Sequence, residues 1–179
     1  MLKKEKKKQE NIEYGTEEVL EMLRQSNYIE KEYSEKALAD SFKAWKYLEK
    51  KKTIALKDIL EIHKIMLKGL DPSIAGKIRN CDVWIGGKRK MFISIQLLED
   101  ELNNWLKVSD TSKIQVYDER SKNKMIMNWH VMYEHIHPFI DGNGRTGRLL
   151  MNWQRMRSNL PINIIKESEK MEYYKLFKN

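Results

Sequence analysis

Apolar residues recur three and four positions apart through most of this chain, which is the spacing of one face of an α-helix. Leu38, Trp45 and Leu48, for example, follow Ser34, a residue type that favours the N-cap position of a helix. The pattern predicts helices at 16–27, from 34 through 48, at 55–68, from 96 through 106, and at 119–136, 143–157 and 168–177.

Two of these predicted helices flank the most unusual part of the sequence. In 119–136 the apolar spacing places Trp129, Met132 and Ile136 on one buried face. In 143–157 we expect Leu149 and Trp153 to be buried. The segment between these two helices therefore joins the ends of two elements that pack in the core.

One stretch departs from the helical spacing. The runs 83–85 and 91–93 are rich in β-branched and aromatic residues, and 86–90 between them contains two glycines. This arrangement predicts a β-hairpin. Because an isolated hairpin is marginal in water, we expect it to lean on the helices. The fold class that follows is mainly α, with one helical domain over 13–179 and a small hairpin at about 83–93.

Charge and composition exclude several classes of protein. Residues 1–9 hold five lysines and one glutamate, so they alone supply +4 of the formal net charge of +8. Such an end can bind nucleic acid or anionic lipid through phosphates, but more often it is solvated. We therefore expect a disordered basic tail over 1–12 and no nucleic-acid partner. The single Cys81 rules out an intramolecular disulfide.

Hydropathy gives no sign of a membrane segment. No apolar run approaches the roughly 18 residues that a membrane span requires. The lysine-rich first residues lack the apolar stretch of a secretory signal. We expect a cytoplasmic protein with no membrane partner.

Glycines and histidines gather between the last two long helices. Three of the eight glycines lie within 142–147, and three of the four histidines lie within 130–137. Asn143 is a suitable N-cap, and the free N–H groups of a helix start bind phosphate. Arg145 and Arg148 would share one face of the first turns, where their charges oppose the helix dipole unless they meet an anion.

Two more side chains add chemistry to this phosphate-binding turn. Asp141 supplies a hard oxygen ligand that suits Mg²⁺. His137 can exchange a proton near neutral pH. A phosphate-binding turn, a metal ligand and a base in one short segment favour transfer to or from a nucleotide phosphate, where positioning and charge neutralisation do most of the catalysis.

The segment from His137 to Arg148 resembles the signature of the Fic-domain family, His-x-Phe-x-(Asp/Glu)-Gly-Asn-Gly-Arg-x-x-Arg, with every fixed position filled. The resemblance extends to 75–87 and covers about 20–177. It implies a Fic-type helical bundle with a β-hairpin flap, and transfer of AMP from ATP to a hydroxyl side chain of a target protein. Glycine at Gly144, where the related Doc branch has lysine, implies transfer of AMP rather than of phosphate.

The resemblance also implies a role for each residue of the catalytic loop 137–148. His137 would be the general base, Asp141 would hold Mg²⁺, and the remaining fixed polar and glycine positions would bind the ATP phosphates, namely Gly142, Asn143, Gly144, Arg145 and Arg148. The flap would hold the target segment by strand addition, through Val83, Trp84, Ile85, Gly86 and Gly87. The implied partners are ATP and a target protein. Self-modification and an oligomer are left open.

Many Fic proteins carry an inhibitory helix with the pattern (Ser/Thr)-x-x-x-Glu-(Gly/Asn). Ser26 and Glu30 fit it on a helix at about 16–30, although Lys31 departs from the usual glycine or asparagine. The segment from Ser168 to Glu172 is a second match. We favour Ser26 and Glu30, whose carboxylate would take the motif's second arginine, Arg148, away from ATP. In some relatives the same glutamate aligns a water that removes AMP, so the reverse reaction stays open.

Two other functions compete with this interpretation. His135, His137 and Asp141 could hold zinc in a metal-dependent hydrolase, but that would leave both arginines of the loop without a task. A non-catalytic module could use the same loop only to hold a nucleotide. His63 and His130 lie on apolar helices, and we expect both to be core residues.

Overall fold

The structure is a computed structural model that describes residues 15–85, 88–89 and 93–177. Its helices are α1 (Thr16–Ile29), α2 (Glu35–Leu48), α3 (Leu56–Leu67), α4 (Leu98–Val108), α5 (Glu119–Ile136), α6 (Asn143–Arg157) and α7 (Lys170–Tyr173), and its strands are β1 (Trp84–Ile85) and β2 (Lys88–Arg89). Shorter 3₁₀ turns lie at Ile95–Leu97, Thr111–Ile114, Glu167–Glu169 and Tyr174–Phe177. The predicted tail over 1–12 lies outside the described residues. Among the described helices, none is long and apolar enough to cross a membrane.

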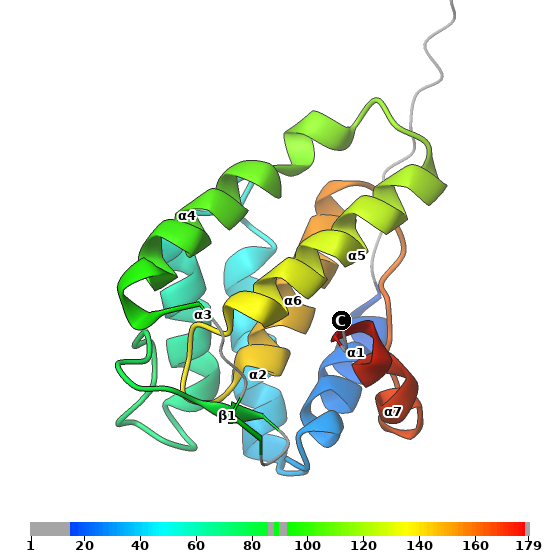
Figure 1. Ribbon diagram of the computed structural model, residues 1–179. Coiled ribbons are helices and arrows are strands. Elements are labelled where there is room, and N and C mark those ends of the chain that lie inside the picture. The colour runs from blue at the N-terminus through cyan, green and yellow to red at the C-terminus, as the bar shows by residue number, and fades with distance from the viewer. Residues whose placement is uncertain (1–14, 86–87, 90–92, 178–179) are drawn as a thin grey trace, which may run out of the picture.

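Helix α6 lies at the centre of the bundle, where it contacts α1, α2, α3 and α5 (Figure 1). Leu149 and Trp153 are buried in the main apolar core, as the sequence predicts. The same helix also buries Arg145 and Arg148. Charged side chains are almost never fully buried without a partner. The buried charges therefore indicate a functional site at the centre of this fold.

The spacing of apolar residues predicts most of these helices correctly. In α2, the Ser34 hydroxyl accepts a hydrogen bond from the Ala37 N–H at 3.2 Å, so Ser34 caps the helix as expected. In α5, Trp129 and Ile136 are buried, but Met132 is 44% exposed. The prediction for Met132 is wrong because the neighbouring Tyr133 faces the core instead.

The hairpin has a different register from the expected one. Strand β1 pairs antiparallel with β2, with Trp84 opposite Arg89 and Ile85 opposite Lys88. The prediction placed 88–89 in the loop and the second strand at 91–93. Only two residues, 86 and 87, separate the paired strands, and two-residue connections that contain glycine are the favoured hairpin loops. Residues 86–87 and 90–92 lie outside the described residues.

The C-terminal segment is less regular than predicted. The sequence predicts one helix at 168–177, whereas α7 spans only Lys170–Tyr173 between two 3₁₀ turns. In Figure 1 this red segment lies beside α1, and the turn at Glu167–Glu169 contacts that helix. The two ends of the described chain therefore meet on one side of the bundle.

Candidate active site

Left-handed backbone marks both ends of the loop that joins α5 to α6. His137 directly follows α5 as its C-cap with φ 49°, and Gly142 precedes α6 with φ 78°. A Cβ atom at Gly142 would lie 2.8 Å from Leu67 and 3.2 Å from His63, so the loop approaches α3 too closely for any side chain. Non-glycine residues at positive φ cost energy and cluster at functional sites. His137 is such a residue.

Asn143 closes this loop rather than capping the helix. Its Oδ1 accepts a hydrogen bond from the Phe139 N–H, and its Nδ2 donates to the Phe139 carbonyl, both at 2.8 Å. The N-cap is Gly142. The expectation for Asn143 is wrong because the buried loop backbone needs hydrogen-bond partners, which a side chain inside the first turn can supply.

His63 braces the loop from α3. The Gly76 N–H donates to its Nδ1 at 2.8 Å, so Nε2 carries the proton and donates to the Asp141 carbonyl at 2.9 Å. Its ring stacks on Phe139 with centroids 3.7 Å apart. Burial lowers the pKa of His63 to about 4, which keeps the ring neutral. The prediction that His63 is a buried core residue is confirmed, and so is that for His130.

The imidazole of His137 is held in one tautomer. Its Nδ1 lies 3.2 Å from the Glu134 carbonyl, which can only accept, so Nδ1 carries the proton and Nε2 carries the lone pair. Burial, followed by the nearby charge of Arg79, lowers the pKa of His137 to about 4, although the bond to Glu134 opposes the shift. His137 is therefore unprotonated at neutral pH, as a general base must be.

Arg79 anchors the start of the loop, and sequence reasoning assigned it no role. Its guanidinium is buried and donates to the carbonyls of His137, Cys81 and Ile93, at 2.8, 3.1 and 2.8 Å. These bonds connect the two flanks of the hairpin to the residue that ends α5. Because all three acceptors are backbone atoms, no side-chain pattern in the sequence indicates this contact.

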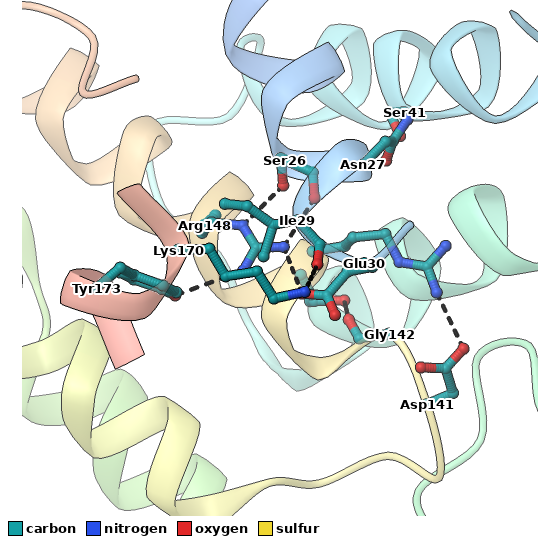
Figure 2. Close-up of polar contacts among 12 residues, drawn as sticks. Ser26, Asn27, Ile29, Glu30, Ser41, Asp141, Gly142, Arg148, Lys170 and Tyr173 are labelled. Carbon is teal, nitrogen blue, oxygen red and sulfur yellow. Dashed lines mark hydrogen bonds and ion pairs between the residues drawn. The ribbon is translucent and has the colours of Figure 1, made fainter. Parts of the chain in front are cut away.

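Arg148 is enclosed by residues from both ends of the chain (Figure 2). Its side chain is 3% exposed and donates to Glu30 Oε1 at 2.7 Å, and to the hydroxyl and carbonyl of Ser26 at 2.9 Å each. Its Nη1 also lies 3.5 Å from the Tyr173 hydroxyl. Burial opposes the charge of Arg148, but Tyr173 and Glu30 together raise its pKa above the ordinary value.

Of the two sequence matches to the inhibitory pattern, the structure brings only one to Arg148. Glu30 lies in contact with that arginine, whereas the Glu172 side chain is 77% exposed and pairs with Lys175 at 2.5 Å. The carboxylate of Glu30 also lies over the start of α6. A Cβ atom at Gly144 would be 2.6 Å from Glu30 Oε1. Glu30 thus places a negative charge where a helix N-terminus favours an anion.

Arg145 has a different partner. Its guanidinium lies 3.0 Å from Asp141 Oδ2, and the Asp141 side chain is 65% exposed. The residue expected to bind Mg²⁺ and one of those expected to bind phosphate therefore pair with each other. The Asp141 carboxylate is the exposed member of this pair and a ligand can reach it, whereas the Arg145 side chain is only 6% exposed.

Glu134 is a further acidic group that sequence reasoning missed. Its Oε1 is buried and has no hydrogen-bond partner in the described part of the chain. A Cβ atom at Gly147 would approach this oxygen to 2.2 Å, so Glu134 lies directly against α6. Burial raises the pKa of Glu134 to about 7, although Arg148 opposes the shift. Its position could have been recognised in the sequence, because an acidic residue on a helix face that is otherwise buried is unusual.

Two further site predictions concern the alternative zinc site and the flap. Among the described residues, no three His, Cys, Asp or Glu side chains form a group that could hold a metal ion, so the alternative zinc set of His135, His137 and Asp141 lacks the expected clustering. Of the predicted flap residues, Val83 is buried, Trp84 and Ile85 form β1, and Gly86 and Gly87 lie outside the described residues.

Known proteins resemble this chain in sequence. Residues 53–154, more than half of the chain, match the model of the Fic/DOC family. "Protein adenylyltransferase Fic" of Drosophila grimshawi is 36% identical over 132 residues, which cover 73% of this chain and 26% of that protein. The protein of the same name from Drosophila mojavensis is 35% identical over 132 residues, covering 73% and 25%. The chain thus spans about a quarter of the length of these curated relatives.

Solved structures resemble it in fold. Fic-1 of C. elegans superposes with a TM-score of 0.75 at 23% identity, over 89% of this chain and 54% of that one. A Fic domain containing signaling protein from Bacteroides thetaiotaomicron also has a TM-score of 0.75, at 18% identity over 89% of this chain and 70% of that one. With its loop 137–148 and the match of the family model, the chain belongs to the Fic/DOC family.

Proposed function

We propose that this chain is a protein adenylyltransferase, which transfers AMP from ATP to a hydroxyl side chain of a target protein. The observation that carries the proposal is the neutral His137, with its proton on Nδ1, at the beginning of a loop that leads into a helix start equipped to bind phosphate. The activity named for the Drosophila relatives supports it.

The proposed reaction needs one proton acceptor and an anchored triphosphate. His137 Nε2 takes the proton of the target hydroxyl, and the hydroxyl oxygen attacks the α-phosphorus of ATP. A new bond forms between the hydroxyl oxygen and the α-phosphorus. The bond between the α-phosphorus and the oxygen that bridges it to the β-phosphorus breaks, and pyrophosphate leaves. The first N–H groups of α6, with Arg145 and Arg148, hold the phosphates and their developing charge.

Asp141 fits the role of a magnesium ligand. Mg²⁺ at nucleotide sites takes one or two carboxylates, with substrate phosphates and waters completing its shell. The Asp141 carboxylate is the exposed partner of Arg145, so it can turn to a cation. Bound there, Mg²⁺ would neutralise phosphate charge. We expect Asp141→Asn to raise the Mg²⁺ concentration needed for half-maximal labelling, with little loss of stability because the side chain faces water.

We propose that Glu30 inhibits this reaction. Its carboxylate holds Arg148 and lies over the anion-binding turn at Gly144, so it competes with a phosphate for the same donors. A charge-assisted bond of this kind is about twice as strong as a neutral one. The triphosphate can then reach its productive position only when α1 releases Arg148.

Several narrower assignments accompany this proposal. Residues 13–179 would form a single Fic domain, and the β1–β2 hairpin would hold the target segment through its backbone. The cytoplasmic location that the sequence favours stays a prediction.

The position of the label on ATP tests the proposed reaction. Purified Glu30→Gly chain is incubated with Mg²⁺, a cell lysate and ATP labelled on either the α- or the γ-phosphate. We expect covalent labelling of the chain or of a target from α-labelled ATP only. Adding His137→Ala should lower the rate by about 10²–10⁴-fold, the usual range for a general base.

His135→Ala is the matched control, because the zinc alternative needs both histidines whereas the proposed reaction needs only His137. Retained labelling in this variant is expected. Covalent transfer of the γ-label would indicate phosphate transfer, and ATP binding without any covalent label would favour the nucleotide-binding module.

A further inference from the structure

The end of α1 that carries Glu30 is completed by a turn of unusual backbone. The Lys31 N–H donates to the Tyr28 carbonyl at 2.8 Å, and the Glu32 N–H donates to the Asn27 carbonyl at 3.1 Å. These bonds form a Schellman motif, in which the residue after the cap adopts the left-handed conformation. Lys31 does so, with φ 60°. The motif leaves two carbonyls near the end of α1 for partners outside the helix.

Those two carbonyls are met by cationic side chains from other elements. The Ser26 carbonyl accepts from Arg148, and the Ile29 carbonyl accepts from Lys170 Nζ (Figure 2). Helix α1 has no basic residue in its own last turn. Because a helix C-terminus carries partial negative charge, a cation placed there stabilises it. Lys170, on α7, supplies this charge from 141 residues away in the sequence.

The C-terminal segment (residues 167–177) makes further contacts with α1 and with Arg148. The Glu167 N–H donates to Gln25 Oε1 at 2.8 Å, and the Tyr33 hydroxyl donates to Glu167 Oε1 at 2.8 Å. The buried Tyr173 places its hydroxyl 3.5 Å from Arg148 and its ring 5.7 Å from the same guanidinium. This one segment therefore contacts both the helix that carries Glu30 and the arginine that Glu30 binds.

The Tyr173 hydroxyl also lies 2.8 Å from His130 Nε2 on α5. His130 is fully buried, so this bond fixes the position of the C-terminal segment on the bundle. Lys170 lies three residues before Tyr173 on the short α7, and neighbours at this spacing share one face of a helix. A movement of α7 would therefore disturb the contacts of Lys170 and Tyr173 together.

We propose that Lys170 and Tyr173 are positioning residues of the C-terminal segment, which holds α1 in place so that Glu30 stays on Arg148. This proposal rests on the proposed function, since it assigns the control of that same site. Release of the C-terminal segment then frees the end of α1, weakens the Glu30–Arg148 pair and lets ATP reach Arg148. The charge at the end of α1 thereby determines how much enzyme is active.

The test compares two lysines of the C-terminal segment in the full chain. Lys170→Met keeps the apolar stem but removes the charge from the end of α1, whereas Lys175→Met removes a charge that pairs with the exposed Glu172. Self-labelling with α-labelled ATP should rise about two- to fivefold in Lys170→Met, the effect of one cation at a helix end. It should not change in Lys175→Met.

A second variant keeps the test independent of that one side chain. Tyr173→Phe retains the ring and loses the hydroxyl shared by Arg148 and His130, and we expect it to raise labelling as well. In the Glu30→Gly background, Lys170→Met should add nothing, because the contact acts through Glu30. An equal rise with and without Glu30 would overturn the proposal.

Amide hydrogen exchange over residues 27–32 gives a readout that needs no activity. Exchange should be faster in Lys170→Met than in the wild type or Lys175→Met. Unchanged exchange would overturn the proposed contact. Faster exchange without labelling in any variant, Glu30→Gly included, would instead overturn the proposed function and leave the role of Lys170 in holding α1 supported.

Discussion

Arg145 and Arg148 lie three residues apart at the start of α6, yet their surroundings differ. Arg145 pairs with the exposed Asp141, whose carboxylate can turn to solvent or to a cation. Arg148 is held by Ser26 and Glu30 on α1 and lies against Tyr173. A ligand can reach the partner of Arg145 directly, but it can reach Arg148 only if α1 moves.

This difference shows how the start of α6 can have its anion-binding groups in place while one of them, Arg148, is already occupied by a carboxylate of the same chain. Arg148 needs a negative partner, since a buried unpaired charge is costly. Glu30 supplies that partner within the chain. In the proposed inhibited state, Glu30 occupies Arg148, while the bond of His137 to the Glu134 carbonyl keeps the proposed base in position.

Truncating the two arginines should separate them by stability. We expect Arg148→Ala to lower the free energy of unfolding by about 2–4 kcal/mol, because it leaves Glu30 and Ser26 without their buried partner. Arg145→Ala should cost less, about 1–2 kcal/mol, because the Arg145 side chain is also buried but its partner Asp141 is solvated and is not left as a buried charge. Urea denaturation measures both, and the same substitution in the same helix makes each the control of the other. Equal losses of stability would contradict the proposed difference between the surroundings of the two arginines.

The acidic neighbours of Arg148 should also give stability a pH dependence. Burial raises the folded-state pKa of Glu134 to about 7, above its ordinary value, so the group contributes stability that is present at low pH and lost as the pH rises through about 7. Glu134→Gln should therefore raise stability by about 1–2 kcal/mol more at pH 8 than at pH 5. Denaturation of both chains at the two pH values tests this. A gain that is equal at both would contradict the assignment.

A smaller effect is expected where α1 ends. The inhibitory pattern has glycine or asparagine after the glutamate, and the structure gives the reason, since that position has φ 60° in this chain. Lys31→Gly should relieve about 1 kcal/mol of backbone strain. If that gain strengthens the end of α1, self-labelling should fall about fivefold, and Lys52→Gly, in a turn between helices, serves as the control substitution. A rise in labelling would count against the coupling of α1 to the site.

The sequence predicts the bundle well where residues act through local spacing. Trp45, Leu149 and Trp153 are buried as expected, and the catalytic loop lies between the two helices that the apolar spacing predicts. Met132 is misplaced because the same spacing is compatible with a buried face that includes Tyr133 instead. The spacing of apolar residues predicts that an amphipathic helix is present more reliably than it predicts which of its residues face the core.

The surroundings of Arg148 show where such prediction ends. Only the family resemblance predicts the contact of Arg148 with Glu30, and nothing in the sequence predicts the contacts of Tyr173 and Lys170. The segment from Ser168 to Glu172 matches the inhibitory pattern, but the residues there that contact α1 and Arg148 are Lys170, at a variable position of the pattern, and Tyr173, directly after it. Contacts between side chains and distant backbone, such as Lys170 with Ile29, leave no periodic signal in a sequence.

The most direct test of the central claim compares Glu30→Gln with Glu172→Gln. Both variants neutralise a glutamate of a segment that fits the inhibitory pattern without adding a glycine to a helix, and of the two only Glu30 contacts Arg148. The rate of self-labelling from α-labelled ATP should rise about tenfold in Glu30→Gln, the effect of removing one charge-assisted contact, and stay at the wild-type rate in Glu172→Gln. A rise in Glu172→Gln with none in Glu30→Gln would contradict the central claim.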